Sequence, residues 1–166
     1  GMHNSLDVRA LQLTTNLNGA TITDCTFMRG NVPGSADHAV DIATCQNVNV
    51  TRLRAGLTQH HVRSSGYGVQ VTNSSGVTFT DTELHGTGAQ VTTSTNVTFT
   101  DTYYCDHLIG KTTVLVPVYV ITVATKAADV LVDGIHFGKS LKYATELIRN
   151  GPYSGIMSVT ACDRIR

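Results

Sequence analysis

Several things are scarce in this sequence of 166 residues. It has no tryptophan, only three prolines and few aromatic or charged side chains, and its 12 acidic residues balance its 12 basic ones. A neutral chain lacks the basic surface that attracts nucleic acid or an anionic membrane. The longest apolar run, residues 114–124, is too short to span a bilayer and contains Pro117. We therefore expect neither nucleic-acid binding nor membrane insertion.

The cysteines exclude two further classes of protein. Their spacing is not that of metal ligands, and their density is not that of a disulfide scaffold. Free thiols filling small core volumes are expected, with no metal and no cofactor. The four residues are Cys25, Cys45, Cys105 and Cys162. No secretion signal opens the chain, so no targeting segment indicates a compartment.

What the chain does have is a repeated phrase rich in threonine and valine. Its aligned apolar positions recur at intervals of 20 to 32 residues. Repetition of a short alternating pattern on this scale is typical of stacked-repeat architectures. The phrase occurs as Ala20–Phe27, Val48–Arg54, Val77–Leu84, Val97–Tyr104 and, more loosely, Val130–His136.

A second short strand precedes each copy by a nearly fixed distance. Leu11–Leu13, Val40–Ile42, Val69–Val71, Ala89–Val91 and Ile121–Val123 each read apolar, polar, apolar, as a strand with one buried face should. They stand eight or nine residues before the apolar positions Ile22, Val50, Phe79, Phe99 and Leu131. A corner follows at Asp24, Arg52, Asp81, Asp101 and Asp133, then a third strand and a return loop of variable length. A constant offset beside one variable loop predicts a solenoid.

With phrases such as Ser94–Asp101 and Gly68–Phe79, residues 10–137 resemble the right-handed parallel β-helix superfamily. Its members include pectate lyases, polysaccharide-degrading phage tailspikes and related epimerases. The resemblance implies an all-β, right-handed, single-stranded parallel β-helix of about five rungs. It also implies that the first-strand face and the return loops leading into it form a saccharide groove. Tailspike-like members are typically trimers.

One domain is expected over residues 1–166, with rungs in 10–137 and a C-terminal cap segment in 138–166. Ser140 can cap a short helix that ends at Gly151-Pro152 and covers the open end of the sheets. Its apolar face would be Leu141, Ala144, Leu147 and Ile148. Residues 155–159 suggest one more strand. The abrupt ending predicts a piece of a longer protein or a small subunit that oligomerises.

Stacked rungs place equivalent residues in columns, about 4.8 Å apart. The corner aspartates are interpreted as turn residues rather than catalytic carboxylates, because Asp tolerates the left-handed conformation. The outward column of the third strands is Thr26, Arg54, Glu83 and Tyr103. Within it, Arg54 and Glu83 are expected to form an ion pair between neighbouring rungs.

The outward column of the first strands differs, because it sets one carboxylate among amides. Its members are Gln12, Asp41, Gln70, Gln90 and Thr122. The return loops hold five of the seven histidines, and imidazole with carboxylate can supply a general acid and base. The catalytic candidates are Asp41, His61 and His38. The substrate-binding candidates are Gln12, Gln70, Gln90, Asp37, His60, Tyr67, Asp106 and His107. Loop His and Asp are also ordinary solvated residues, so binding without catalysis is the preferred hypothesis.

The resulting prediction is a phage tailspike- or fibre-like surface protein, located on a virion or outside the cell, that recognises polysaccharide. The alternative is an enzyme, a polysaccharide hydrolase, lyase or epimerase acting at the Asp41 face. No Arg or Lys occupies the first strands, which argues against pectate-lyase chemistry. A homotrimer is expected, and the residues proposed for its interface are Val114, Val116, Val118 and Tyr119.

Overall fold

The computed structural model describes residues 11–29, 38–57, 67–85, 88–105, 118–137 and 153–166. Within these ranges the chain forms strands and turns and no helix. Every strand pairing described is parallel. The prediction of an all-β chain built from parallel strands is confirmed.

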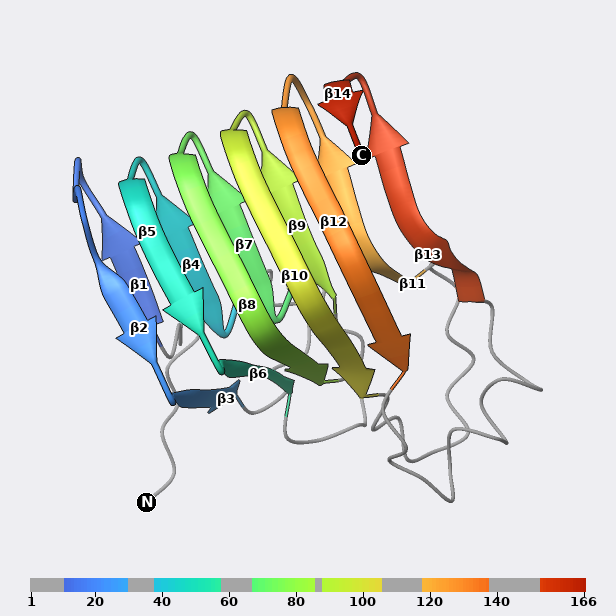
Figure 1. The fold of residues 1–166 in the computed structure, drawn as a ribbon, viewed down its shortest axis with the longest axis horizontal. Coiled ribbons are helices and arrows are strands. Elements are labelled where there is room, and N and C mark those ends of the chain that lie inside the picture. The colour runs from blue at the N-terminus through green and yellow to red at the C-terminus, as the bar shows by residue number, and fades with distance from the viewer. Residues whose placement is uncertain (1–10, 30–37, 58–66, 86–87, 106–117, 138–152) are drawn as a thin grey trace, which may run out of the picture.

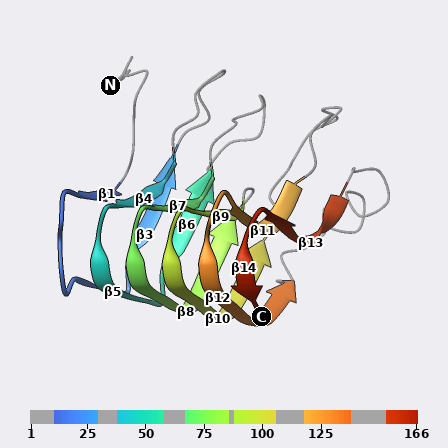
Figure 2. The same cartoon turned by 90° about the horizontal axis from the view of Figure 1, so that it is seen from above.

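The strands are divided between two sheets, and the chain passes alternately from one to the other (Figures 1 and 2). The first sheet has six strands in the order β1 (Leu11–Thr14), β4 (Val40–Ala43), β7 (Val69–Thr72), β9 (Ala89–Thr92), β11 (Val118–Ala124) and β13 (Tyr153–Thr160). The second has eight strands. Six follow the order β14 (Asp163–Ile165), β12 (Ala128–Phe137), β10 (Thr95–Cys105), β8 (Ser75–His85), β5 (Gln46–Thr51) and β2 (Thr21–Thr23). The remaining two strands are β3 (Thr26–Arg29) and β6 (Arg54–Leu57), which pair with each other. β6 also pairs with β8.

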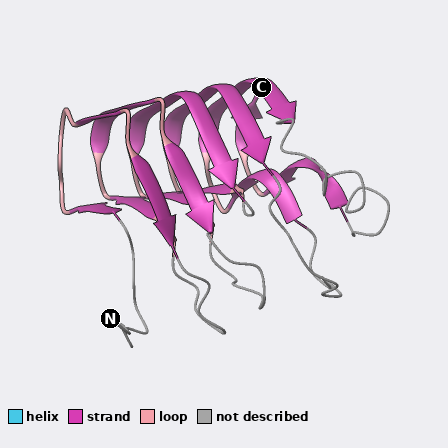
Figure 3. Cartoon of the chain, turned by 90° about the horizontal axis from the view of Figure 1, so that it is seen from below, coloured by secondary structure: helices cyan, strands magenta, loops and turns pink. Residues whose placement is uncertain are grey.

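Short turns join each strand of the first sheet to a strand of the second (Figure 3). In the inner repeats a single residue in each turn adopts the left-handed conformation, as at Thr44 and Thr93, with φ of 58° and 50°. Asn, as at Asn73, enters this region at modest cost, whereas β-branched Thr enters it at a larger steric cost, so these turns form without glycine but under local strain. One strand of each sheet and its turn make one repeat.

Neighbouring repeats pair in the predicted register. The first buried column, Leu13, Ile42, Val71, Val91 and Val123, is confirmed by its Cα pairings. In the second column Ile22, Val50, Phe79 and Phe99 pair in sequence. The Phe79 and Phe99 rings stack with centroids 4.7 Å apart and are fully buried, so the core lies between the two sheets.

The last member of that second column was predicted wrongly. Phe99 pairs with Val132, whereas Leu131 pairs with Thr98 on the outer face and is 41% exposed. The physical reason is the preceding turn, where two consecutive residues, Thr125 and Lys126, are left-handed. The turn is one residue longer than in the inner repeats, and a one-residue shift moves every following side chain to the other face.

The same shift corrects the corner column. Asp24, Arg52, Asp81 and Asp101 all have φ between 51° and 55°, as left-handed corners require. Asp133 instead pairs with Thr100 in the strand. Gly134, with φ of 76°, takes the corner beside Asp101, since glycine adopts this conformation without a Cβ penalty.

The C-terminal prediction is tested only in part. The strand expected at 155–159 is confirmed as β13, which pairs β11, and β14 then pairs β12, so both sheets continue to residue 165. The helix expected between Ser140 and Gly151 lies outside the described residues. Of the proposed trimer interface, Val114 and Val116 also lie outside them, while Val118 and Tyr119 belong to β11.

Three of the cysteines, Cys25, Cys45 and Cys162, are described as free thiols, as predicted. Cys45 is buried, whereas Cys25 and Cys162 are half-buried at the two ends of the stack. Their thiols donate to backbone carbonyls two residues earlier; for Cys45 this carbonyl belongs to Ala43.

Candidate functional site

A ladder of polar side chains runs across the outer face of the first sheet. The predicted column Gln12, Asp41, Gln70, Gln90 and Thr122 pairs residue by residue, and the register carries it on to Ser158. We call this column with its attached ring pair, His38 and Tyr67, the first-sheet ladder. Because the side chains of a strand alternate in direction, the fully buried apolar residues on either side of each of the four inner members, from Asp41 to Thr122, fix the outward placement of those members.

Hydrogen bonds tie the ladder together across repeats. Gln70 Nε2 donates to Gln90 Oε1 at 2.9 Å, and Gln90 Nε2 donates to the Tyr67 hydroxyl at 3.3 Å. At the other end Gln12 Nε2 reaches Asp41 Oδ2 at 3.5 Å. A hydrogen-bonded amide row is pre-oriented, so its remaining donors and acceptors are presented to a ligand in fixed directions.

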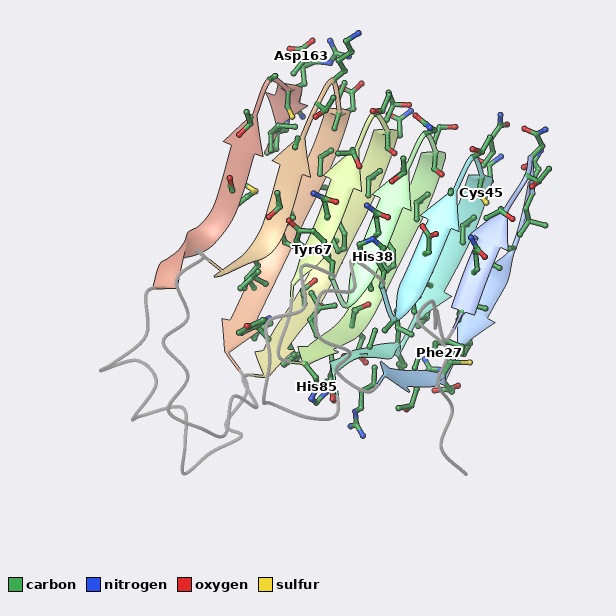
Figure 4. The ribbon with its side chains drawn as sticks, turned by 180° about the vertical axis from the view of Figure 1, so that it is seen from behind. Phe27, His38, Cys45, Tyr67, His85 and Asp163 are labelled. Atoms are coloured by element: carbon green, nitrogen blue, oxygen red, sulfur yellow. The ribbon has the colours of Figure 1, made fainter. Side chains whose placement is uncertain are left out.

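His38 and Tyr67, the ring pair of the ladder, lie where the chain enters β4 and β7, and they are close together over the first sheet (Figure 4). Their ring centroids are 5.9 Å apart with planes inclined by 23°. The Tyr67 backbone N–H donates to His38 Nδ1 at 2.9 Å. An accepting Nδ1 places the imidazole proton on Nε2. His38 is 8% exposed, which makes it a structural partner of Tyr67 rather than an open loop residue.

Asp41 is less open than the sequence suggests. Its side chain was predicted to face outward as a groove carboxylate, but it is 5% exposed. A buried carboxylate is retained where polar partners satisfy it, and Gln12 is one of these partners. The half-buried amides of Gln70 and Gln90 are therefore more available to a ligand than Asp41 is.

The remaining predicted site residues are not tested by the structure. Their proximity to Asp41 stays a prediction, because they lie outside the described residues: Asp37, His60, His61, Asp106 and His107. The structure therefore assembles the ladder and the His38–Tyr67 pair from the predicted set.

A second polar cluster lies in the second sheet, on β6 and at the end of β8, whereas the ladder lies on the first sheet. The predicted ion pair is confirmed, with Arg54 Nε 2.6 Å from Glu83 Oε2 and Arg54 Nη2 3.2 Å from Glu83 Oε1. His85 Nε2 lies 3.0 Å from the same Oε2. The hydrogen bond with Arg54 is the main cause that holds the pKa of Glu83 below its ordinary value, and the hydrogen bond with His85 adds to it.

His85 was missed as a partner of Glu83. The segment predicted from the sequence ended at Leu84, but β8 runs to His85, which is labelled in Figure 4. His85 is 7% exposed. The signal was present, since residues two apart on a strand share a face.

A stacked ring pair, Tyr103 and His136, lies on the neighbouring strands β10 and β12 of the second sheet. Tyr103 and His136 have centroids 4.8 Å apart, and His136 Nε2 is 3.3 Å from Asp101 Oδ1. The pairing of Tyr103 with His136 follows from the longer turn before β12, so the sequence register used above could not find it.

Comparisons with protein-family models, with curated proteins and with solved structures find no match to this chain. In the part of the chain that the structure describes, no three His, Cys, Asp or Glu side chains gather closely enough to hold a metal ion. None of the described segments is a helix long and apolar enough to cross a membrane. The functional argument therefore depends on the geometry of the first-sheet ladder.

Proposed function

We propose that this chain is a right-handed parallel β-helix, similar to tailspike members of the pectate-lyase-like superfamily, that recognises an extended polysaccharide along the first-sheet ladder. It serves as a structural element on a virion or an extracellular surface and assembles as a homotrimer. Polysaccharide is the ligand class, because the ladder offers several neutral donors and acceptors in a row and only one, buried, carboxylate.

The fold part of the proposal is supported by the strand order. Strands of both sheets follow one another in chain order with parallel pairing, and equivalent positions meet at sequence separations of 29 and 20 residues. A parallel connection between neighbouring strands is right-handed in the great majority of cases, which favours that hand here.

One observation carries the functional part: the amides of Gln70 and Gln90 are joined to each other and to Tyr67 on a rigid, in-register sheet. Repeats about 4.8 Å apart present similar groups at regular spacing, which suits a ligand that is itself a polymer. Sites for hydroxylated ligands combine a few fixed polar groups with an apolar or aromatic surface, and the Tyr67 ring supplies that surface.

The test begins with a glycan array, followed by calorimetric titration of the selected oligosaccharide. The double variant Gln70→Ala/Gln90→Ala should weaken binding about tenfold or more, because each truncation removes a ligand hydrogen bond and loosens the ladder. Affinity should also rise with oligosaccharide length until the ladder is spanned.

A matched control is Thr78→Ala/Thr98→Ala, which truncates two in-register polar residues on the outer face of the second sheet. Binding should be unchanged in this variant. If no glycan binds, or if the two double variants bind alike, the proposal is wrong. Sedimentation equilibrium at micromolar concentration tests the trimer separately, and a monomer there would remove that part alone.

A further inference from the structure

A polar groove runs along the turns that join the first sheet to the second. Its volume is about 310 Å³, and its rim is formed by side chains of successive repeats. We call it the turn groove and define its rim as Asn16, Gln46, Asn73, Ser75, Thr93 and Thr95. It lies beyond the ends of the first-sheet strands, so it is distinct from the first-sheet ladder.

The floor of the turn groove is fixed by a hydrogen-bond chain between repeats. The Cys45 N–H donates to Ser74 Oγ at 3.0 Å, and the Ser74 N–H donates to Ser94 Oγ at 3.1 Å. The Ser74 and Ser94 hydroxyls in turn donate to the carbonyls of Thr72 and Thr92. With Ser74 and Ser94 almost fully buried, the floor is rigid and its polar groups are already satisfied.

The rim is different, because its polar side chains remain available apart from that of Thr93, whose hydroxyl donates to the Thr125 carbonyl at 3.3 Å. The side-chain hydrogen bonds described for this part of the chain engage neither the amides of Asn16, Gln46 and Asn73 nor the hydroxyls of Ser75 and Thr95. Amides and hydroxyls both donate and accept, which matches the hydroxyl groups of a sugar or polyol.

The lining is also uncharged. Asn, Gln, Ser and Thr make up all of it apart from Cys45, whose thiol pKa is raised by burial, so the floor stays neutral at physiological pH. Placing a charged group here would remove its hydration without supplying an opposite charge, and that is costly. The chemistry of the turn groove therefore selects against acidic and basic ligands.

We propose that the turn groove is a second binding site, which takes a neutral polyhydroxylated ligand such as an uncharged oligosaccharide lying across successive repeats. The site is independent of the proposed function, because none of its rim residues belongs to the first-sheet ladder. The rim spans repeats about 4.8 Å apart, so the ligand contacts similar groups at each step.

The probes are maltohexaose and cellohexaose, which are neutral, and trigalacturonate, which is acidic. In ¹⁵N-correlation spectra of the full chain, at least one neutral probe should shift the side-chain amide signals of Asn73 and Gln46, and trigalacturonate should shift them much less. The double variant Asn73→Gly/Thr95→Val should weaken that binding about tenfold, since two hydrogen-bonding groups are lost. Glycine preserves the left-handed backbone at position 73, where φ is 49°, and valine preserves the shape of threonine.

The ladder variant Gln70→Ala/Gln90→Ala serves as the control and should leave these shifts unchanged. Failure of the ladder test with the groove shifts intact would remove only the proposed function. The groove proposal is overturned if neither neutral probe shifts the signals, if trigalacturonate shifts them equally, or if the groove variant binds as well as wild type.

Discussion

The inner repeats and the terminal repeats of this molecule are built from one pattern, yet they differ in how well they are buried. Ile42, Val71 and Val91 of the inner repeats are fully buried, whereas Leu13, in the same column, is only half-buried. Large exposed apolar residues occur in the terminal repeats, among them Leu17 and Val159. An inner strand has partners on both sides, and a terminal strand has one.

The turns differ in the same way. Inner turns use one left-handed residue, but the first and the fifth repeats use two, at Thr15 with Asn16 and at Thr125 with Lys126. The comparison suggests that the inner repeats, which carry Gln70 and Gln90, provide the rigid platform, while stability declines toward both ends.

The largest difference between the two regions should appear when the loss of unfolding free energy in Phe79→Ala is compared with that in Phe27→Ala. Phe79 is fully buried in a stack with Phe99, so its truncation should lower the free energy of unfolding by ~3 to 5 kcal/mol. Phe27 is half-buried at the edge, so Phe27→Ala should lower the free energy of unfolding by only ~1 to 2 kcal/mol. Denaturant titration measures both, and equal losses would refute the difference between the regions.

Gly56→Ala and Gly19→Ala each add one Cβ, and we expect the loss of stability to be larger at Gly56. A Cβ at Gly56 would stand 2.1 Å from the His85 carbonyl oxygen, so the third strands must separate, at a cost of at least ~3 kcal/mol. At Gly19 nothing lies within 4 Å and only the left-handed φ of 82° opposes the change, at ~1 kcal/mol. Thermal unfolding should rank them in this order; the reverse order would contradict the third-strand pairing.

Glu83→Gln should remove a smaller, pH-dependent contribution. Since the pKa of Glu83 lies below its ordinary value of 4.5, the ion pair stabilises the fold above that pH, and the contribution is lost as the pH falls through the lowered pKa. Its partner Arg54 is half exposed, so solvent screening limits the effect to ~0.5 to 1 kcal/mol.

Wild type and Glu83→Gln should therefore differ most in stability at pH 7, and urea titrations should show the difference shrinking as the pH falls below 4.5 through the lowered pKa of Glu83. Asp24→Asn in the terminal repeat is the control, because it breaks the exposed Asp24–Arg52 pair and should change stability less. A Glu83 difference that does not shrink as the pH is lowered would mean that the ion pair is not its cause.

Leu131→Thr should have the smallest effect, within ~0.5 kcal/mol of wild type, because Leu131 lies on the outer face. In the register assumed from sequence it would be a core residue, and the same change would cost several times more. A loss above ~2 kcal/mol would restore that register and contradict the nine-residue spacing from Val123 to Val132.

The repeat phrase predicted the inner repeats well because each element of the pattern is local: a polar residue between two apolar ones, then a left-handed corner. Val71 with Val91, Phe79 with Phe99 and Arg54 with Glu83 all pair as expected. The predicted register fails after Lys126, because this second left-handed residue lengthens the turn before β12. No feature of the composition marks that extra residue.

The site was predictable to a lesser degree. Alternation alone placed Gln70 and Gln90 on one outer column, which the structure confirms. Burial of Asp41 and the accepting role of His38 Nδ1 depend on contacts between repeats, which periodicity does not encode. His85 was missed because the predicted strand ended at Leu84, one residue too early.

Both proposed binding sites require the repeats to pair in register, and the double variant Gln70→Cys/Gln90→Cys tests that register on the ladder itself. These Cα atoms are direct partners, within the range that a disulfide bridges, whereas Gln70→Cys/Thr92→Cys is two residues out of register and beyond it. Mild oxidation followed by peptide mapping should reveal a bond between positions 70 and 90 and none between 70 and 92. A bond in the second variant, or in neither, would contradict the account.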